Sequence, residues 1–148
     1  MDLIQMMKGE LDMMRVLIVE DDSRFRASLA ATLSDEYVVH SVSSGRAAVE
    51  FLSKYSVDVI LLDMRMDEGD GFFVLGRLGN LAMTPKVLVI SGLDDIGKVT
   101  KAMRLGAHDY LVKPVSLATL KGSLRHLVGM DAHHRTSGVR RELMTASA

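Results

Sequence analysis

The chain of 148 residues contains no cysteine and only two prolines. Without cysteine there can be no disulfide, no thiolate metal site and no cysteine nucleophile, and nothing supports a secreted protein. No apolar run approaches the length of a membrane span, and the N-terminus lacks the basic start and long apolar core of a signal peptide. We therefore expect a cytoplasmic protein that does not cross a membrane.

An excess of charge of one sign is also missing, because the formal net charge is -1. The chain has no global basic field that would recruit nucleic acid directly, and no acidic excess that would indicate a solvating tail. With 48% hydrophobic and 25% charged residues, the composition is that of an ordinary soluble globular protein. The length indicates a single domain that is large enough to bury its own core.

Four short apolar runs, rich in Val, Ile and Leu, carry the secondary-structure signal. They read VLIVEDD at 16–22, VILLDM at 59–64, VLVISG at 87–92 and YLVKP at 110–114. The runs lack strict alternation of apolar and polar residues, which is typical of strands buried on both faces of a parallel sheet. A fifth run, YVVHSV at 37–42, is shorter and more polar, so we expect it to be an edge strand.

Segments with helical spacing of apolar residues separate the runs, and most of them begin near a residue type that caps helices. In chain order the expected capping residues are Ser23, Ser43 or Ser44, Asp94 or Asp95, and Ser116. Gly106 is expected to end the fourth helix. The segment 71–81 has the same spacing, although Gly76 and Gly79 weaken it as a helix. Strand and helix thus alternate five times, which predicts a doubly wound α/β domain with right-handed crossovers.

Two terminal segments fall outside this pattern. Residues 1–14 carry apolar side chains at helical steps, which predicts a short helix or a frayed leader. Residues 130–148 are polar and lack apolar periodicity, so we expect a flexible tail or the stump of a linker. The folded domain is therefore predicted to span residues 15–129.

Polar side chains follow the predicted strands at the points where the strands end. These residues are Glu20, Asp21, Asp63, Ser91 and Lys113. In an open parallel sheet the carboxyl ends of the strands converge on one edge, so residues that are far apart in sequence can meet there. Three carboxylates with a hydroxyl and an ammonium group indicate phosphoryl chemistry with a divalent metal.

These five positions, in this order, resemble the receiver domain of two-component response regulators, and the likeness covers about Arg15 to Gly129. The family pattern is an acidic pair after the first strand, an aspartate after the third, Ser or Thr after the fourth, and Lys-Pro after the fifth. Any one of these residues alone is better explained as a helix cap, a turn residue or a surface charge; only the joint pattern is specific. The resemblance implies a flavodoxin-like sheet of strand order 2-1-3-4-5 and a signalling domain rather than a turnover enzyme.

The resemblance also implies a role for each acidic residue. Asp63 would accept a phosphoryl group from a phosphohistidine on a sensor histidine kinase or a histidine phosphotransfer protein, with autodephosphorylation at most. Packed carboxylates repel one another, so either their pKa values rise or a cation neutralises them, and Mg²⁺ suits an all-oxygen site. Glu20, Asp21 and Asp63 would hold this ion together with the backbone carbonyl of Arg65. Lys113 would pair with Asp63 first and with the phosphoryl group afterwards.

A conformational switch is implied by two further residues. Ser91 would donate a hydrogen bond to a phosphoryl oxygen, and Tyr110 would follow Ser91 inward and change a protein-binding surface. The resemblance further implies a cis peptide bond between Lys113 and Pro114. One departure from the family is Asp67, which stands where a proline is usual and is expected to leave its loop looser.

Alternatives stay open on the residues alone. A flavin-binding, flavodoxin-like module would share the fold, but it needs a phosphate cradle rich in Ser, Thr and Gly where this chain has EDDSRFR at 20–26. An aspartate-dependent phosphatase would place a second carboxylate at the position of Arg65. The chain can also be the receiver part of a longer DNA-binding or enzymatic regulator, rather than a single-domain regulator that acts on a downstream protein or as a homodimer.

Overall fold

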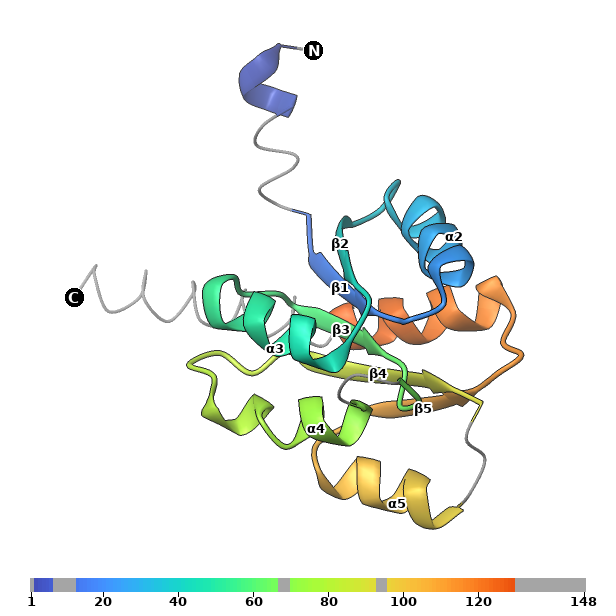
Figure 1. Ribbon diagram of the computed structural model, residues 1–148. Helices are drawn as coiled ribbons and strands as arrows, with labels where there is room; N and C mark the ends of the chain where they lie inside the picture. The colour runs from blue at the N-terminus through green and yellow to red at the C-terminus, as the bar shows by residue number, and fades with distance from the viewer. Residues whose placement is uncertain (1, 7–12, 67–69, 93–95, 130–148) are drawn as a thin grey trace, which may run out of the picture.

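Five parallel strands form the sheet of this protein, as seen in a computed structural model that describes residues 2–6, 13–66, 70–92 and 96–129. The strands are β1 (Arg15–Val19), β2 (Val38–Val42), β3 (Val59–Leu62), β4 (Lys86–Ser91) and β5 (Asp109–Val112). Their spatial order is β2-β1-β3-β4-β5, and every neighbouring pair is parallel (Figure 1). The predicted doubly wound sheet, its strand order and the edge position of the strand near residues 37–42 are confirmed.

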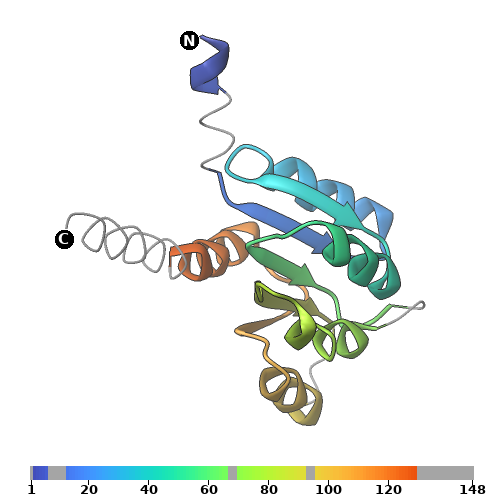
Figure 2. The same ribbon diagram turned by 90° about the vertical axis from the view of Figure 1, so that its left-hand side faces the viewer.

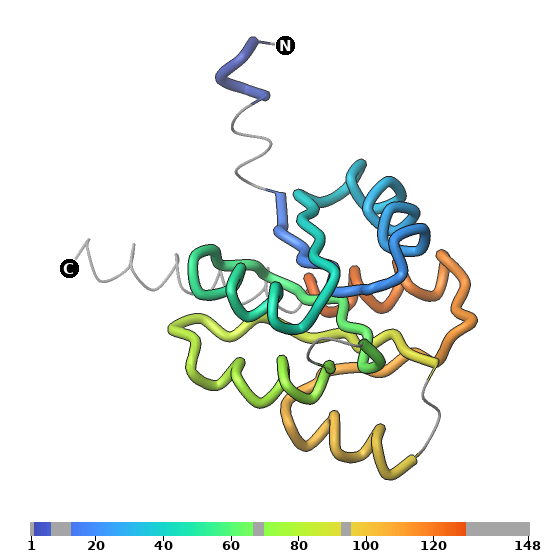
Figure 3. The backbone as a smooth tube through the Cα atoms, viewed as in Figure 1, coloured from blue at the N-terminus to red at the C-terminus, as the bar shows by residue number. Residues whose placement is uncertain are grey.

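Helices cover both faces of the sheet (Figure 1 and Figure 2). They are α2 (Ser23–Leu33), α3 (Gly45–Lys54), α4 (Gly71–Leu75), the 3-10 helix η1 (Leu78–Asn80), α5 (Ile96–Arg104) and a last helix over 117–129. Figure 3 traces the backbone through these alternating elements, coloured from blue at the N-terminus towards red at the C-terminus. Helices α3, α4 and α5 bury their apolar residues in one core, and α2 and the last helix do so in a second core on the other face.

The strands serve both cores at once, which explains their continuous apolar runs. Along β1, Leu17 and Val19 belong to the core under α3, α4 and α5, whereas Val16 and Ile18 belong to the core under α2 and the last helix. All four side chains are at most 1% exposed. Because successive side chains of a strand point to opposite faces, a strand covered on both sides must be apolar throughout.

Among the predicted helix caps that lie within the described residues, only the one at α2 differs from the structure. Its capping residue is Asp22, whose carboxylate accepts hydrogen bonds from the backbone N–H groups of Arg24 and Phe25 at 3.0 and 3.1 Å. The prediction of Ser23 is therefore wrong, because Ser23 already has a helical backbone and the extended residue before it can aim its side chain back at the free N–H groups.

Two of the other predicted caps are confirmed. The Ser44 hydroxyl accepts from the N–H of Ala47 at 3.1 Å, and the Ser116 hydroxyl accepts from the N–H of Thr119 at 3.1 Å. Gly106 ends the turn after α5 with a φ of 114°, a value that favours glycine. The predicted capping residues Asp94 and Asp95 lie outside the described residues.

The segment 71–81 is less helical than its spacing predicted. Helix α4 ends at Leu75, Gly76 forms its carboxyl cap, and the chain re-enters a single 3-10 turn at Leu78. Asp70 caps the start by accepting from the N–H of Phe73 at 2.9 Å. The first residue of the helix must be glycine, because a Cβ on Gly71 would lie 2.7 Å from the backbone of Met64.

The ends of the chain are described only in part. Residues 3–6 form a short helix whose Leu3, Ile4 and Met6 side chains are exposed, while the rest of the predicted helical pattern up to residue 12 lies outside the described residues. The predicted tail, residues 130–148, lies outside them as well. The domain boundaries at residues 14 and 129 stay a prediction. Among the helices that the structure describes, none has the length and apolar character needed to cross a bilayer.

Candidate functional site

The carboxyl ends of four strands bring the predicted polar residues to one edge of the sheet. Glu20 follows β1, Asp63 follows β3, Ser91 ends β4 and Lys113 follows β5. Backbone hydrogen bonds between the strands continue past the strand ends. The N–H of Asp63 donates to the carbonyl of Val19, and the N–H of Lys113 donates to the carbonyl of Ser91. The pairing of the parallel strands therefore fixes the backbone positions from which these side chains extend.

Three carboxylates form a cluster at this edge. One oxygen each from Glu20, Asp21 and Asp63 lies within 4.8 Å of the other two. Glu20 and Asp63 are buried, with 3% and 5% of their surface exposed, whereas Asp21 is exposed. Carboxylate oxygens in this number suit a hard divalent cation such as Mg²⁺, so the donor set present fits the metal that the sequence predicted.

Lys113 partly neutralises the two buried acids. Its Nζ lies 3.2 Å from Oε2 of Glu20 and 3.4 Å from Oδ2 of Asp63. Burial, and after it the adjacent Asp63 carboxylate, raise the pKa of Glu20 from 4.5 to about 7, although Lys113 acts in the opposite direction. The cluster therefore holds more negative charge than one ammonium group offsets, and a second cation or a proton is favoured there.

Hydrogen bonds from the backbone orient the acidic side chains. The N–H of Arg65 donates to Oδ1 of Asp63 at 3.0 Å, and the N–H of Asp22 donates to Oε1 of Glu20 at 3.3 Å. Since Oδ2 of Asp63 contacts Lys113, the two oxygens of this carboxylate have different partners. The Arg65 peptide thus lies next to Asp63, and the role of its carbonyl as a metal ligand stays a prediction.

Arg26 stabilises the loop that carries the acidic pair, and the sequence analysis missed it. Its guanidinium donates to the backbone carbonyl of Glu20 at 2.8 Å and to that of Asp21 at 3.4 Å. The only available signal was a basic residue about one turn into the helix that follows the acids. Such a residue on a helix is usually solvent-exposed, so its sequence position alone does not indicate this contact.

Ser91 and Tyr110 lie on neighbouring strands close to Lys113. Ser91 is fully buried, and its backbone carbonyl accepts from the N–H of Lys113 at 2.9 Å. Tyr110 is half-buried in β5 opposite Val89 and packs against the core under α3, α4 and α5. Their predicted part in a switch is not tested by these contacts. The peptide bond between Lys113 and Pro114 is cis, as predicted, and Asp67 lies outside the described residues.

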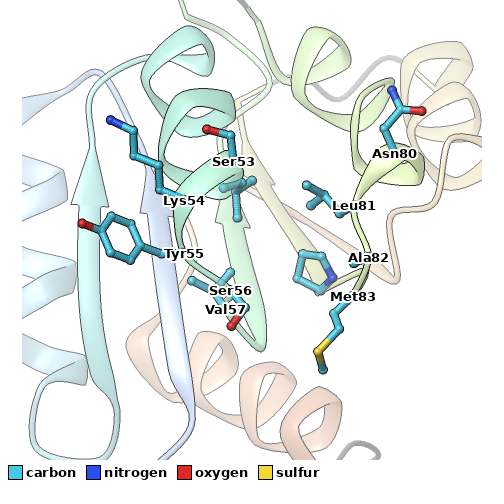
Figure 4. A pocket seen from close by; sticks show the side chains of 11 residues that line it. Ser53, Lys54, Tyr55, Ser56, Val57, Asn80, Leu81, Ala82 and Met83 are labelled. Atoms are coloured by element: carbon cyan, nitrogen blue, oxygen red, sulfur yellow. The ribbon is translucent and has the colours of Figure 1, made fainter.

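A groove of about 580 Å³ lies at the opposite edge of the sheet and contains none of the predicted site residues. It runs between the end of α3 and the segment before β4, where Tyr55, Leu81 and Met83 contribute to its wall (Figure 4). The predicted site residues therefore lie together at the charged end of the sheet and not in this hollow.

Comparison with known proteins agrees with the geometry. Residues 16–125 match the model of the response regulator receiver domain. The cell cycle response regulator CtrA of Brucella ovis is 30% identical over 125 residues, which cover 84% of this chain and 54% of the relative. CtrA of Brucella abortus strain 2308 matches to the same extent. The chain thus spans about half the length of these curated relatives.

Solved receiver domains have the same fold. A CheY-like response regulator receiver domain protein from Methanospirillum hungatei JF-1 superposes with a TM-score of 0.77 at 20% identity, over 82% of this chain and 99% of that one. The receiver domain of a signal transduction histidine kinase from Syntrophus aciditrophicus superposes with a TM-score of 0.71 at 29% identity, over 78% and 90%.

Proposed function

Because this chain belongs to the response regulator receiver domain family of two-component signalling, we propose that it is a phosphoacceptor that depends on Mg²⁺ and carries the phosphoryl group on Asp63. The observation that carries the proposal is the pair of buried carboxylates, Glu20 and Asp63, in contact with one ammonium group and adjacent to a third acid. Neighbouring carboxylates raise the free energy of an ionised acid, so clustering them has a cost that a purely structural role does not require.

Glu20, Asp21 and Asp63 would hold the ion with the backbone carbonyl of Arg65. When bound, Mg²⁺ would supply positive charge that offsets the oxygens of the incoming phosphoryl group. The raised pKa of Glu20 supports this role, because a carboxyl group that resists ionisation alone gains most from a neighbouring cation.

Asp63 would act as the nucleophile. The Arg65 N–H fixes Oδ1, and Lys113 faces Oδ2, so the carboxylate is held by two donors from different elements. A carboxylate oxygen would form the bond to phosphorus as the bond from phosphorus to the imidazole nitrogen of a partner's phosphohistidine breaks, and the leaving imidazole would take up a proton. The product is an aspartyl phosphate, and its hydrolysis is the only turnover that we propose.

Lys113 and Ser91 would then contact the phosphoryl oxygens. The two residues are already joined through the backbone hydrogen bond between β5 and β4, so a shift of one bears on the other. Tyr110 lies in β5, three residues before Lys113, and would transmit the shift to the surface formed by α5, β5 and the last helix. A charge-assisted hydrogen bond or two supplies the few kcal/mol that such a switch needs, at about 1.5–3 kcal/mol each.

The partners follow from this chemistry. The donor would be a sensor histidine kinase or a histidine phosphotransfer protein, and the output would be a downstream protein, a second copy of the chain or an attached output domain. Since CtrA is about twice as long as the matched region, the second half of such a regulator is one form that the output can take. A flavin-binding role has no support, because the loop after β1 presents carboxylates where a flavin phosphate would bind.

The proposal is tested with a small phosphodonor. Incubation with acetyl phosphate and Mg²⁺ should add one phosphoryl group, measured by intact-mass analysis, and removal of Mg²⁺ with a chelator should prevent it. Asp63→Asn should abolish the adduct because the amide is not a nucleophile. The same mass increase on the substituted protein would refute the assignment of Asp63.

A further inference from the structure

Phe25 contacts the ammonium group of the site lysine. The Nζ of Lys113 lies 4.5 Å from the centroid of the Phe25 ring, within the range in which the electron-rich face of an aromatic ring attracts a cation. The side chain of Lys113 is 29% exposed, and Phe25 is half-buried against the core under α2 and the last helix. The ammonium group therefore contacts Glu20 after β1, Asp63 after β3 and Phe25 in α2.

The first turn of α2 holds this ring in place. The N–H of Phe25 donates to the capping carboxylate of Asp22 at 3.1 Å, and the adjacent Arg26 donates to the carbonyl of Glu20 at 2.8 Å. The same turn thus positions the ring and the loop of metal-binding acids. A lysine side chain has four flexible carbons and would otherwise sample many positions in water, at a cost in entropy when it is confined.

We propose that Phe25 is a positioning residue that keeps the Lys113 ammonium group beside Glu20 and Asp63 before the phosphoryl group arrives. This inference rests on the proposed phosphoacceptor function. The ring acts through Lys113 and forms no bond to the reacting atoms. Its competitor is a purely structural role, in which Phe25 only fills space between α2 and the sheet.

Two substitutions separate these roles. Phe25→Leu keeps an apolar side chain in the core but removes the aromatic face, whereas Phe25→Tyr keeps the face. With saturating Mg²⁺ and acetyl phosphate, Phe25→Leu should slow phosphorylation by about two- to fivefold, the factor that corresponds to a cation–π contact at a partly exposed site. Phe25→Tyr should retain most of the rate. Equal rates for Phe25→Leu and the wild type, or equally slow rates for both variants, would overturn the proposal.

A matched control and a double-mutant cycle exclude general packing effects. Phe51 is also half-buried on a helix, but it packs against the rings of His40 and Tyr55 rather than a lysine, so Phe51→Leu should leave the rate unchanged. In a Lys113→Ala background, Phe25→Leu should have no further effect. A further loss of the same size in that background would assign the effect to packing and contradict the proposal.

A spectroscopic measurement tests the contact without phosphorylation. In the unmodified protein the methylene protons next to the Lys113 ammonium group should be shifted upfield by the ring, and NMR should show this shift in Phe25→Tyr but not in Phe25→Leu. Absence of the shift in the wild type would overturn the positioning role even if Asp63 is phosphorylated. If the shift is present but no phosphoryl group is taken up, the phosphoacceptor function fails while the placement of Lys113 by Phe25 stands.

Discussion

Two aspartates at the two ends of β3 show how position decides what one residue type does. Asp58 precedes the strand, and its carboxylate accepts the N–H of Arg15 at 2.8 Å while its own N–H donates to the Arg15 carbonyl at 2.9 Å. Asp63 follows the strand, is 5% exposed and shares an ammonium group with Glu20. The first aspartate completes the backbone pairing of β1 and β3, whereas the second belongs to a cluster of three carboxylates that a cation can neutralise.

The difference between Asp58 and Asp63 should be clearest when the ammonium group beside Asp63 is removed. We expect Lys113→Ala to slow phosphorylation by acetyl phosphate about 100-fold. This is the typical loss of rate when one preorganised donor is removed from a site where charge develops in the transition state. Mg²⁺ binding should persist, because the three carboxylates remain. Calorimetric titration with Mg²⁺ and intact-mass time courses measure the two quantities. An unchanged rate would remove Lys113 from the proposed mechanism.

The crowding of carboxylates around Glu20 should also affect the free energy of unfolding. Between the ordinary pKa of Glu20, 4.5, and its folded value of about 7, the folded chain holds a proton that the unfolded chain has lost. The free energy of unfolding therefore falls as the pH rises through this window. Glu20→Gln removes the penalty and should raise the free energy of unfolding at pH 8, without Mg²⁺, by about 3 kcal/mol.

Denaturant titration measures this gain, and pH supplies its control. At pH 4 the carboxyl group of the wild type is largely protonated in both states, so the two proteins should differ little. A gain of the same size at pH 4 and pH 8 would point to packing rather than charge, and no gain at pH 8 would contradict the penalty.

Arg26 supports the loop that carries Glu20 and Asp21, the two acids next to Asp63. Arg26→Ala removes the charged donor that holds the carbonyls of Glu20 and Asp21, and we expect Mg²⁺ affinity to fall about tenfold, as befits the loss of one such hydrogen bond. Arg26→Lys should recover part of the affinity, because an ammonium group can donate to one of the two carbonyls. Calorimetric titration checks both variants, and unchanged affinity in Arg26→Ala would show that the loop needs no such support.

The smallest effect is expected from a substitution of Asp58, which lies before β3 at the end of the strand opposite Asp63. Asp58→Ala leaves the N–H of Arg15 without this acceptor and should lower the free energy of unfolding by about 1 kcal/mol. The phosphorylation rate should stay at the wild-type value, because Asp58 lies at the far end of the strand from the site. A slowed reaction in a folded variant would mean that the two ends of β3 are coupled.

The sequence predicted the sheet and the meeting of Glu20, Asp21, Asp63 and Lys113, because both follow from apolar runs of strand length and from the convergence of parallel strand ends. It did not distinguish Asp22 from Ser23 as the cap of α2, since both residue types cap helices and only the backbone conformation decides between them. The contact between Phe25 and Lys113 joins segments far apart in the chain, so no local pattern could indicate it.

Gly71 limits how the loop after Asp63 can be altered. A side chain at this position would collide with the backbone of Met64 and lie 3.0 Å from the carbonyl oxygen of Asp63. Saturation mutagenesis of positions 70 and 71 should therefore recover the capping residues Ser, Thr and Asn beside Asp at position 70, but only glycine at position 71. A new loop grafted onto this domain would therefore have to lead into α4 through glycine, the residue type that avoids these contacts.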